Sequence, residues 1–175
     1  MQPSVPSFAE LLDGAQSSAV HLEMRDAYGV ANEVEEFARW KRTGECDVDP
    51  GSAGWSPWVE LIRRTVCRGV AVRRARIVSE PVSDYVRFEH AGTRVNIGAG
   101  EQVRWLPRRR ASDIALPGND FWLIDDHIVR WNHFTGEGAS GGGEMNDDPA
   151  VAKLCSQAFE AVWARAVPHE EYELR

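Results

Sequence analysis

The stretch from Val70 to Val78 is the feature that most limits how this chain can fold. It is rich in β-branched residues, which favour a strand, yet it carries Arg73, Arg74 and Arg76. Successive side chains of a strand point to opposite faces, so Arg73 faces one way while Arg74 and Arg76 face the other. A buried strand tolerates guanidinium groups only where they are paired or lie at its end. The pattern therefore predicts a central strand with a polar site near its carboxyl end.

The rest of the chain alternates between helical and strand patterns, which predicts an α/β domain. We expect one domain over residues 1–175, with a mixed sheet flanked by helices. The segment 82–90 fits both periods and is assigned to a helix, and the glycine-rich stretch 136–143 is assigned to a flexible loop. The expected helices cover residues 7–14, 30–42, 57–68, 82–90 and 149–167, and the expected strands cover residues 18–25, 70–78, 102–106, 121–125 and 128–134.

Cysteine usage and hydropathy bear on the compartment. Cys46, Cys67 and Cys155 are odd in number and far apart, which suits a reducing environment. No apolar run approaches the length of a membrane span, so we expect a soluble cytoplasmic protein without membrane contact. Because no Cys/His spacing matches a metal site and no cofactor motif is complete, we expect no metal and no cofactor.

The charge distribution points to an anionic partner. The whole chain has a formal net charge of −7, yet the segment from Arg63 to Arg110 holds twelve arginines and only four acidic residues. Positive charge concentrated in one segment of an acidic protein offers an anion a place to bind.

The polar run from Ser79 to Glu89 follows the predicted central strand, and ligands of open α/β sheets bind beyond the carboxyl ends of the strands. There, arginines could clamp a carboxylate or a phosphate while hydroxyl groups add hydrogen bonds. The alternative is internal pairing, for example of Arg76 with Glu80 and of Arg87 with Asp84. The predicted ligand-binding residues are Arg76, Ser83, Tyr85, Arg87, Glu89 and Arg104, with Glu23 and Asp120 nearby.

Three other features have two interpretations each. The run Arg108–Arg110 could contact nucleic acid, but a solvated or partner-facing loop is the preferred interpretation. Asp125 and Asp126 could hold a cation, but a polar turn explains them better because no further oxygen ligands follow. His133 is a candidate general base, although a lone histidine in an aromatic strand is more often structural.

Five segments of the chain resemble an uncharacterised family of actinobacterial domains, the DUF6879-like family. They span residues 18–28, 72–81, 83–89, 119–126 and 168–172, so the resemblance extends over nearly the whole chain. Members of that family tend to be encoded beside small helix-turn-helix regulators. The resemblance therefore implies a regulatory setting and a helix-turn-helix regulator protein as partner.

At a greater distance, the layout is similar to one half of a phospholipase D-like domain. The match rests on Gly69–Val72 and on the strand pair whose turn begins at Asp125. In that family a catalytic His-x-Lys follows, which here would fall near 119–122, where neither residue occurs. The resemblance implies that an anion-binding cleft is kept and that phosphohydrolase chemistry is lost, although fold alone does not give function.

Taken together, these observations favour a non-catalytic cytoplasmic module that binds an anionic small molecule or a regulatory protein. One alternative is an enzyme acting on a phosphorylated or carboxylated metabolite, with Glu89, Asp120 or His133 as acid or base. Another is nucleic-acid binding through Arg108–Arg110. A homodimer also stays open, because the tryptophans Trp55, Trp58 and Trp163 suit either a core or a subunit contact.

Overall fold

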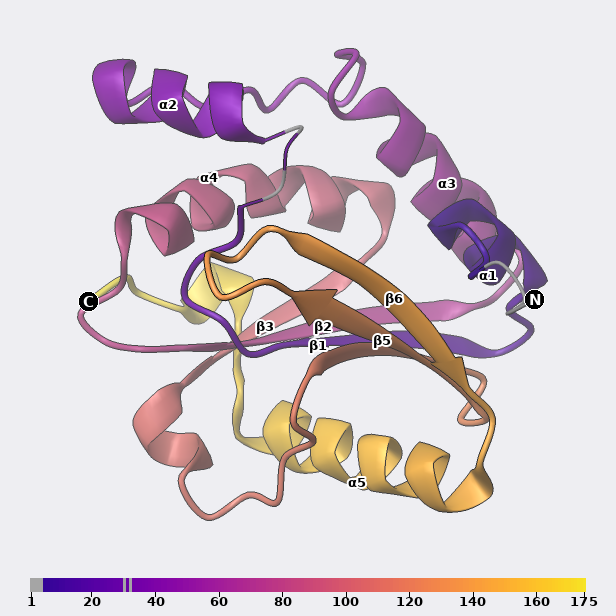
Figure 1. Cartoon of the computed structure of the whole chain (residues 1–175). Coiled ribbons are helices and arrows are strands. Elements are labelled where there is room, and N and C mark those ends of the chain that lie inside the picture. Colours follow the sequence, from indigo (N-terminus) through magenta and orange to yellow (C-terminus); the bar gives the residue numbers. More distant parts are fainter. Residues whose placement is uncertain (1–4, 30, 32) are drawn as a thin grey trace.

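A seven-stranded mixed sheet forms the centre of the molecule in the computed structural model, which describes residues 5–29, 31 and 33–175 (Figure 1). The strand order is β6-β5-β4-β1-β2-β3-β7. Strands β1, β2 and β3 are parallel, and the other strands join them in antiparallel pairs. The strands are β1 (Ser18–Glu23), β2 (Ala71–Val78), β3 (Gln102–Pro107), β4 (Asp120–Ile124), β5 (Ile128–Phe134), β6 (Ser140–Asn146) and β7 (Val167–Pro168).

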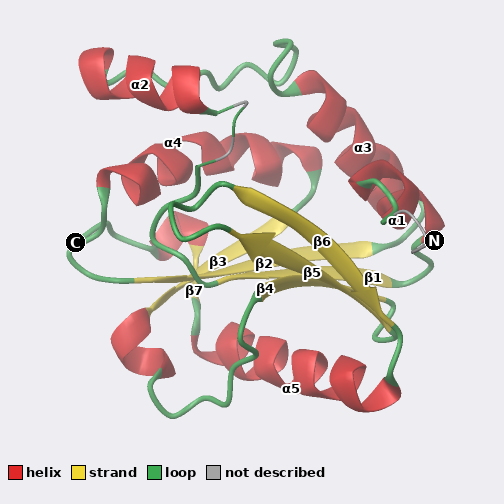
Figure 2. Ribbon diagram, viewed as in Figure 1, coloured by secondary structure: helices red, strands yellow, loops and turns green. Residues whose placement is uncertain are grey.

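Helices cover both faces of this sheet, as the sequence predicted (Figure 2). Helices α1, α3 and α4 lie on one face, α5 lies on the other, and α2 lies over α4. The helices are α1 (Phe8–Gly14), α2 (Val34–Thr43), α3 (Ser56–Cys67), α4 (Asp84–Ala99) and α5 (Pro149–Arg165). The predicted start of α2 at Val30 lies outside the described residues. None of the helices in the described ranges has the length and apolar character needed to cross a membrane.

The helix ends follow from local chemistry. Ser7 and Glu10 form the predicted capping box of α1, in which each side chain accepts from the other residue's backbone N–H. Gly44 ends α2 in the left-handed conformation at φ 72°, which glycine adopts without strain. Asp148 caps α5 by accepting from the N–H of Ala150.

The two faces of β2 are used as the alternation predicted. Arg73 lies on the α5 face, where its guanidinium stacks on Phe159 and Trp163 and pairs with Glu160. Arg74 and Arg76 lie on the α4 face and are buried. The strand therefore places two guanidinium groups between the sheet and the helices.

Two sequence assignments were wrong. The stretch 136–143 is not all loop: residues 136–139 form a turn, but β6 begins at Ser140 and pairs with β5. Its glycines allow a close approach: a Cβ at Gly143 would lie 3.0 Å from the guanidinium of Arg130, and one at Gly141 would lie 3.3 Å from the carbonyl of His133. Helix α4 also continues to Ala99, nine residues past the predicted end. The polar residue Thr93 is buried and interrupts the apolar pattern of the sequence, but it does not interrupt the helix.

Asp125, in the turn between β4 and β5, has a structural role. The Asp125 carboxylate accepts hydrogen bonds from the N–H groups of Gln16, Ser17 and Ser18 at 2.7–3.2 Å. It thus ties this turn to the segment that leads into β1. Within the described ranges, no cluster of three or more His, Cys, Asp or Glu residues could hold a metal ion.

Replacing Asp125 with alanine should lower the free energy of unfolding by about 1–2 kcal/mol more than replacing Asp126 with alanine, because three backbone N–H groups lose a charged acceptor. The two residues have nearly equal φ angles, 52° and 55°, so the backbone strain of alanine is matched. Urea denaturation of both variants measures the difference. Equal losses would mean that the turn is held by its backbone conformation alone.

Candidate anion-binding site

An ion-pair network joins β1, β2, α4 and the turn between α4 and β3. It contains five ionisable side chains: Glu23, Arg74, Arg76, Glu89 and Glu101. Four of them are buried, and the side chain of Glu89 is only 12% exposed. Arg74 donates to Glu23 at 2.7 Å and to Glu101 at 2.5 Å. Arg76 donates to Glu23 at 2.5 Å, and its Nη2 lies 3.3 Å from Glu89. The parallel register of β1 and β2 sets Glu23 opposite Arg76 and so produces the central pair.

Polar neighbours complete the network. The Thr93 hydroxyl accepts from Nη1 of Arg76 at 2.6 Å, and the Asn96 amide donates to Glu101 at 2.8 Å. Every nitrogen of the Arg76 guanidinium therefore contacts an acceptor inside the protein. A carboxylate or a phosphate would have to compete with these internal acceptors for the guanidinium group.

The network contains three carboxylates and two guanidinium groups, and this excess of acid affects protonation. Burial opposes ionisation of Glu23, but Arg76 and Arg74 outweigh it and hold the pKa of Glu23 far below its usual range. Burial raises the pKa of Glu89 to about 8, because Arg76 offsets it only in part and the Glu23 charge adds to it. Burial also lowers the pKa of neighbouring His21 to about 3, so this ring is neutral near pH 7.

A second polar group adjoins the network where β1 ends and β4 begins. The carboxylate of Asp120 accepts from the N–H of Met24 at 3.0 Å and from the hydroxyl of Tyr28. Burial raises the pKa of Asp120 to about 6, against the opposing hydrogen bond from Tyr28. The hydroxyl of Tyr85 donates to Glu33 at 2.5 Å, and its ring lies 5.9 Å from that of Tyr28.

The structure brings five of the eight sequence-predicted site residues into one region: Glu23, Arg76, Glu89, Tyr85 and Asp120. Ser83 lies at the start of α4, where its hydroxyl accepts from the N–H of Val86 and donates to the carbonyl of Asp26.

The predicted clamp of Arg76, Arg87 and Arg104 does not form. Register sets Arg104 opposite Ala75, so it lies on the α5 face, where it stacks on Trp163. Arg87 is half-buried and makes no ion pair within the described part of the chain.

The partners of Arg76 differ from the one that the sequence suggested, and the three acid/base candidates do not lie together. Arg76 pairs with Glu23 and Glu89, whereas Glu80 accepts from the hydroxyl of Tyr172 at 3.0 Å. His133 lies on the α5 face of the sheet, 3.4 Å from Glu144. It is therefore separated by the sheet from Glu89 and Asp120.

Most arginines of the segment 63–110 donate side-chain hydrogen bonds to other residues of the protein. Arg108, for example, donates to the hydroxyl of Ser79 and to the carbonyl of Met24 and lies 3.5 Å from Asp26. Five others make no side-chain hydrogen bond or ion pair with the described residues. They are Arg63, Arg87, Arg94, Arg109 and Arg110.

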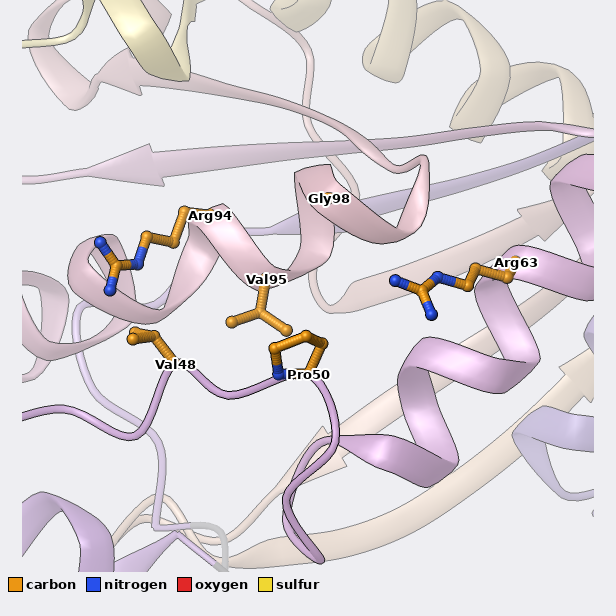
Figure 3. Close-up of a pocket in the computed structure, with 6 residues that line it drawn as sticks. All are labelled: Val48, Pro50, Arg63, Arg94, Val95 and Gly98. Atoms are coloured by element: carbon orange, nitrogen blue, oxygen red, sulfur yellow. The ribbon is translucent and has the colours of Figure 1, made fainter.

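Two of these five border one pocket, the Arg63–Arg94 pocket, with a volume of about 270 Å³ (Figure 3). Arg63 comes from α3 and Arg94 from α4, and both are exposed. Between them lie apolar or small residues of α4 and of the segment that precedes α3: Val48, Pro50, Val95 and Gly98.

Local packing holds the outer wall of this pocket in place. The indole N–H of Trp55 donates to the carbonyl of Asp47 at 2.9 Å, which closes the segment that carries Val48 and Pro50. The Trp55 ring lies against Gly92 of α4, where a Cβ would be only 3.2 Å away. Glycine at this position therefore permits the close approach of the segment to α4.

Comparison with known proteins gives the class of fold. The structure is similar to a phospholipase D family member, Nuc from Salmonella typhimurium, with a TM-score of 0.54 and 11% identity over 91% of this chain and 86% of that one. The fold is therefore phospholipase D-like, as the sequence resemblance implied. A second solved structure, the archaeal chromatin protein TrmBL2, described as having a novel mode of DNA binding, has a TM-score of 0.48 and 13% identity. That match covers 90% of this chain and 47% of TrmBL2.

The family follows from the sequence itself. Residues 6–174 match the family model described as a domain of unknown function, DUF6879, and the chain belongs to this family. No curated protein matches the chain.

Proposed function

We propose that this protein is a non-catalytic module that binds an anionic small molecule in the Arg63–Arg94 pocket. One observation supports the proposal: two exposed arginines, one from α3 and one from α4, line the same hollow, and neither has an acidic partner among the described residues. The arginine-rich segment predicted an anion site, and this pocket is where two of its uncommitted arginines occur together.

The lining indicates the class of ligand. Guanidinium groups present planar donors that suit carboxylate and phosphate oxygens. Val48, Pro50 and Val95 add apolar surface beside them. A ligand with one phosphate or carboxylate group and a small apolar body complements both parts, as expected for sites with few polar groups on an apolar lining.

The buried network supports this proposal as a scaffold. It connects β1 and β2 to α4 through Glu23, Arg76 and Glu89, and α4 carries Arg94. A non-catalytic role fits the environment of Glu89 and Asp120, whose carboxyl groups are occupied by internal partners and largely buried.

We also propose a regulatory, cytoplasmic setting for the module. The thiols of Cys46, Cys67 and Cys155 are all free, which suits a reducing compartment. An acidic surface of a helix-turn-helix regulator is the alternative occupant of the pocket, because its carboxylates would meet the same two arginines. Nucleic-acid binding through Arg108–Arg110 has less support, because Arg108 is held by internal partners.

Phenyl phosphate is a suitable probe because it combines a phosphate with a small apolar ring. We expect the Arg63→Ala/Arg94→Ala double variant to bind it about tenfold more weakly than the wild type, since charge-assisted contacts are lost. Broadening of the ligand's ³¹P signal during a protein titration measures this. Inorganic phosphate should bind more weakly than phenyl phosphate, because it lacks the apolar body.

The matched control is Arg109→Ala/Arg110→Ala, which removes the same charge from two exposed arginines elsewhere. We expect it to change the dissociation constant less than about twofold, because these residues lie outside the pocket. Equal weakening in both double variants would reduce the effect to general charge attraction and would refute the assigned site. An acidic peptide that binds where phenyl phosphate does not would identify a protein partner instead.

A further inference from the structure

A second pocket, on the opposite face of the sheet, has the opposite electrostatic character. This Trp131 pocket has a volume of about 390 Å³ and lies where the 117–119 segment, β5, β6 and the first turns of α5 meet. The residues that decide its chemistry are Pro117, Trp131, His133, Glu144, Val151 and Leu154.

Its apolar part is built from rigid elements. Trp131 is fixed by an edge-on contact with Phe121, with ring centroids 5.9 Å apart and an interplanar angle of 78°. Val151 and Leu154 approach from α5, and Leu154 is one of the few large apolar side chains left exposed, at 43%. Apolar surface that a fold leaves uncovered inside a hollow is suited to an apolar ligand group.

Its polar part carries a single acidic charge. Glu144 on β6 lies 3.4 Å from Nε2 of His133 on β5, and the pairing of the two strands fixes both residues on the same side of the sheet. No arginine or lysine is among the residues that line this pocket in the described chain. The lining therefore offers a carboxylate beside an aromatic surface and no cation that would neutralise a ligand anion.

We infer that the Trp131 pocket binds an organic cation, namely an amine with a flat apolar body. The apolar body would lie among Trp131, Val151 and Leu154, and the ammonium group would meet the Glu144 carboxylate. An ammonium close to an indole ring also gains a cation–π attraction. The inference is independent of the Arg63–Arg94 pocket, which has the opposite charge and lies across the sheet.

Phenethylammonium is the probe for this pocket, and 3-phenylpropionate is its anionic counterpart with a similar body. We expect phenethylammonium to shift the indole N–H signal of Trp131 in ¹H–¹⁵N spectra, after assignment with Trp131→Phe. Glu144→Gln should weaken binding about three- to tenfold, a modest effect because the carboxylate is well exposed to solvent. Glu173→Gln, at an exposed position near the C-terminus, should leave binding unchanged.

Each outcome bears on the inference. A Trp131 shift that weakens in Glu144→Gln, with an otherwise unchanged spectrum, would support it. Equal binding of phenethylammonium to wild type and Glu144→Gln, equal binding of 3-phenylpropionate, or no shift at millimolar probe would overturn it. Phenyl phosphate tests the Arg63–Arg94 pocket, so a negative result with phenethylammonium would not contradict the proposed function.

Discussion

Replacing Glu23 with alanine should lower the free energy of unfolding by about 3–5 kcal/mol, the cost of removing one partner from a buried ion pair. The Glu23 carboxylate accepts from Arg74 and from Arg76, and all three residues are less than 9% exposed. Arginine does not lose its proton in proteins, so both guanidinium charges would remain buried with one carboxylate fewer. Urea denaturation of the wild type and the variant measures the loss.

A more exposed ion pair, which joins β2 to α5 on the other face of the sheet, provides the control. Glu160 pairs with Arg73 at 2.6 Å, but its side chain is 54% exposed. Glu160→Ala should therefore cost less than about 1 kcal/mol. If Glu23→Ala lowered the free energy of unfolding no more than Glu160→Ala, the buried network would stabilise the fold no more than an exposed ion pair does.

Glu89 should make the protein less stable as the pH rises above neutral. Burial raises the pKa of Glu89 to about 8 in the folded state from an ordinary value of 4.5. A carboxyl group whose pKa is higher in the folded state stabilises that state fully when the pH is below its pKa in the unfolded chain. This stabilisation is lost progressively as the pH rises through the pKa of the folded state. Between pH 6 and 9 we expect the loss to be about 2–3 kcal/mol in the wild type.

The Glu89→Gln variant should show little of this loss, because an amide of nearly the same shape cannot ionise. It keeps an oxygen that can accept from Arg76, so the geometry of the network is preserved in part. Urea denaturation of both proteins at pH 6, 7.5 and 9 tests the difference. Parallel pH profiles would show that Glu89 is already ionised at pH 6 and that Arg76 outweighs its burial.

The sequence predicted the framework of the fold well, because the framework depends on local patterns. Two-residue alternation in β2 correctly separated Arg73 from Arg74 and Arg76, and the capping box at Ser7 and Glu10 marked the start of α1. These signals are complete within a few residues of the chain.

The grouping of site residues depended on register, which a single sequence does not contain. Arg104 and Arg76 belong to neighbouring parallel strands, yet Arg104 pairs with Ala75 and so lies on the other face. A shift of one residue would have placed Arg104 beside the network. The pairing partner of Arg76 was likewise a neighbour in space, Glu23, rather than the nearby Glu80.

The Arg63–Arg94 pocket was missed for a related reason. Its residues come from α3, α4 and the segment before α3, and the predicted helix ended before Arg94 and Gly98. Because these two positions are four residues apart, they share one face of a helix, which is a signal that the correct length of α4 would have revealed. The arginine count indicated an anion site but could not indicate which arginines the fold leaves without partners.

The most direct test of the proposed anion site follows the Nε–Hε signals of individual arginines in ¹H–¹⁵N spectra while phenyl phosphate is added. Assignment uses single Arg→Lys variants at positions 63, 76 and 94. We expect the Arg63 and Arg94 signals to shift together, whereas the Arg76 signal, whose Nε donates to Glu23 at 2.5 Å, should not change. A shift of Arg76 with Arg63 and Arg94 unaffected would contradict the assignment and would place the anion in the buried network.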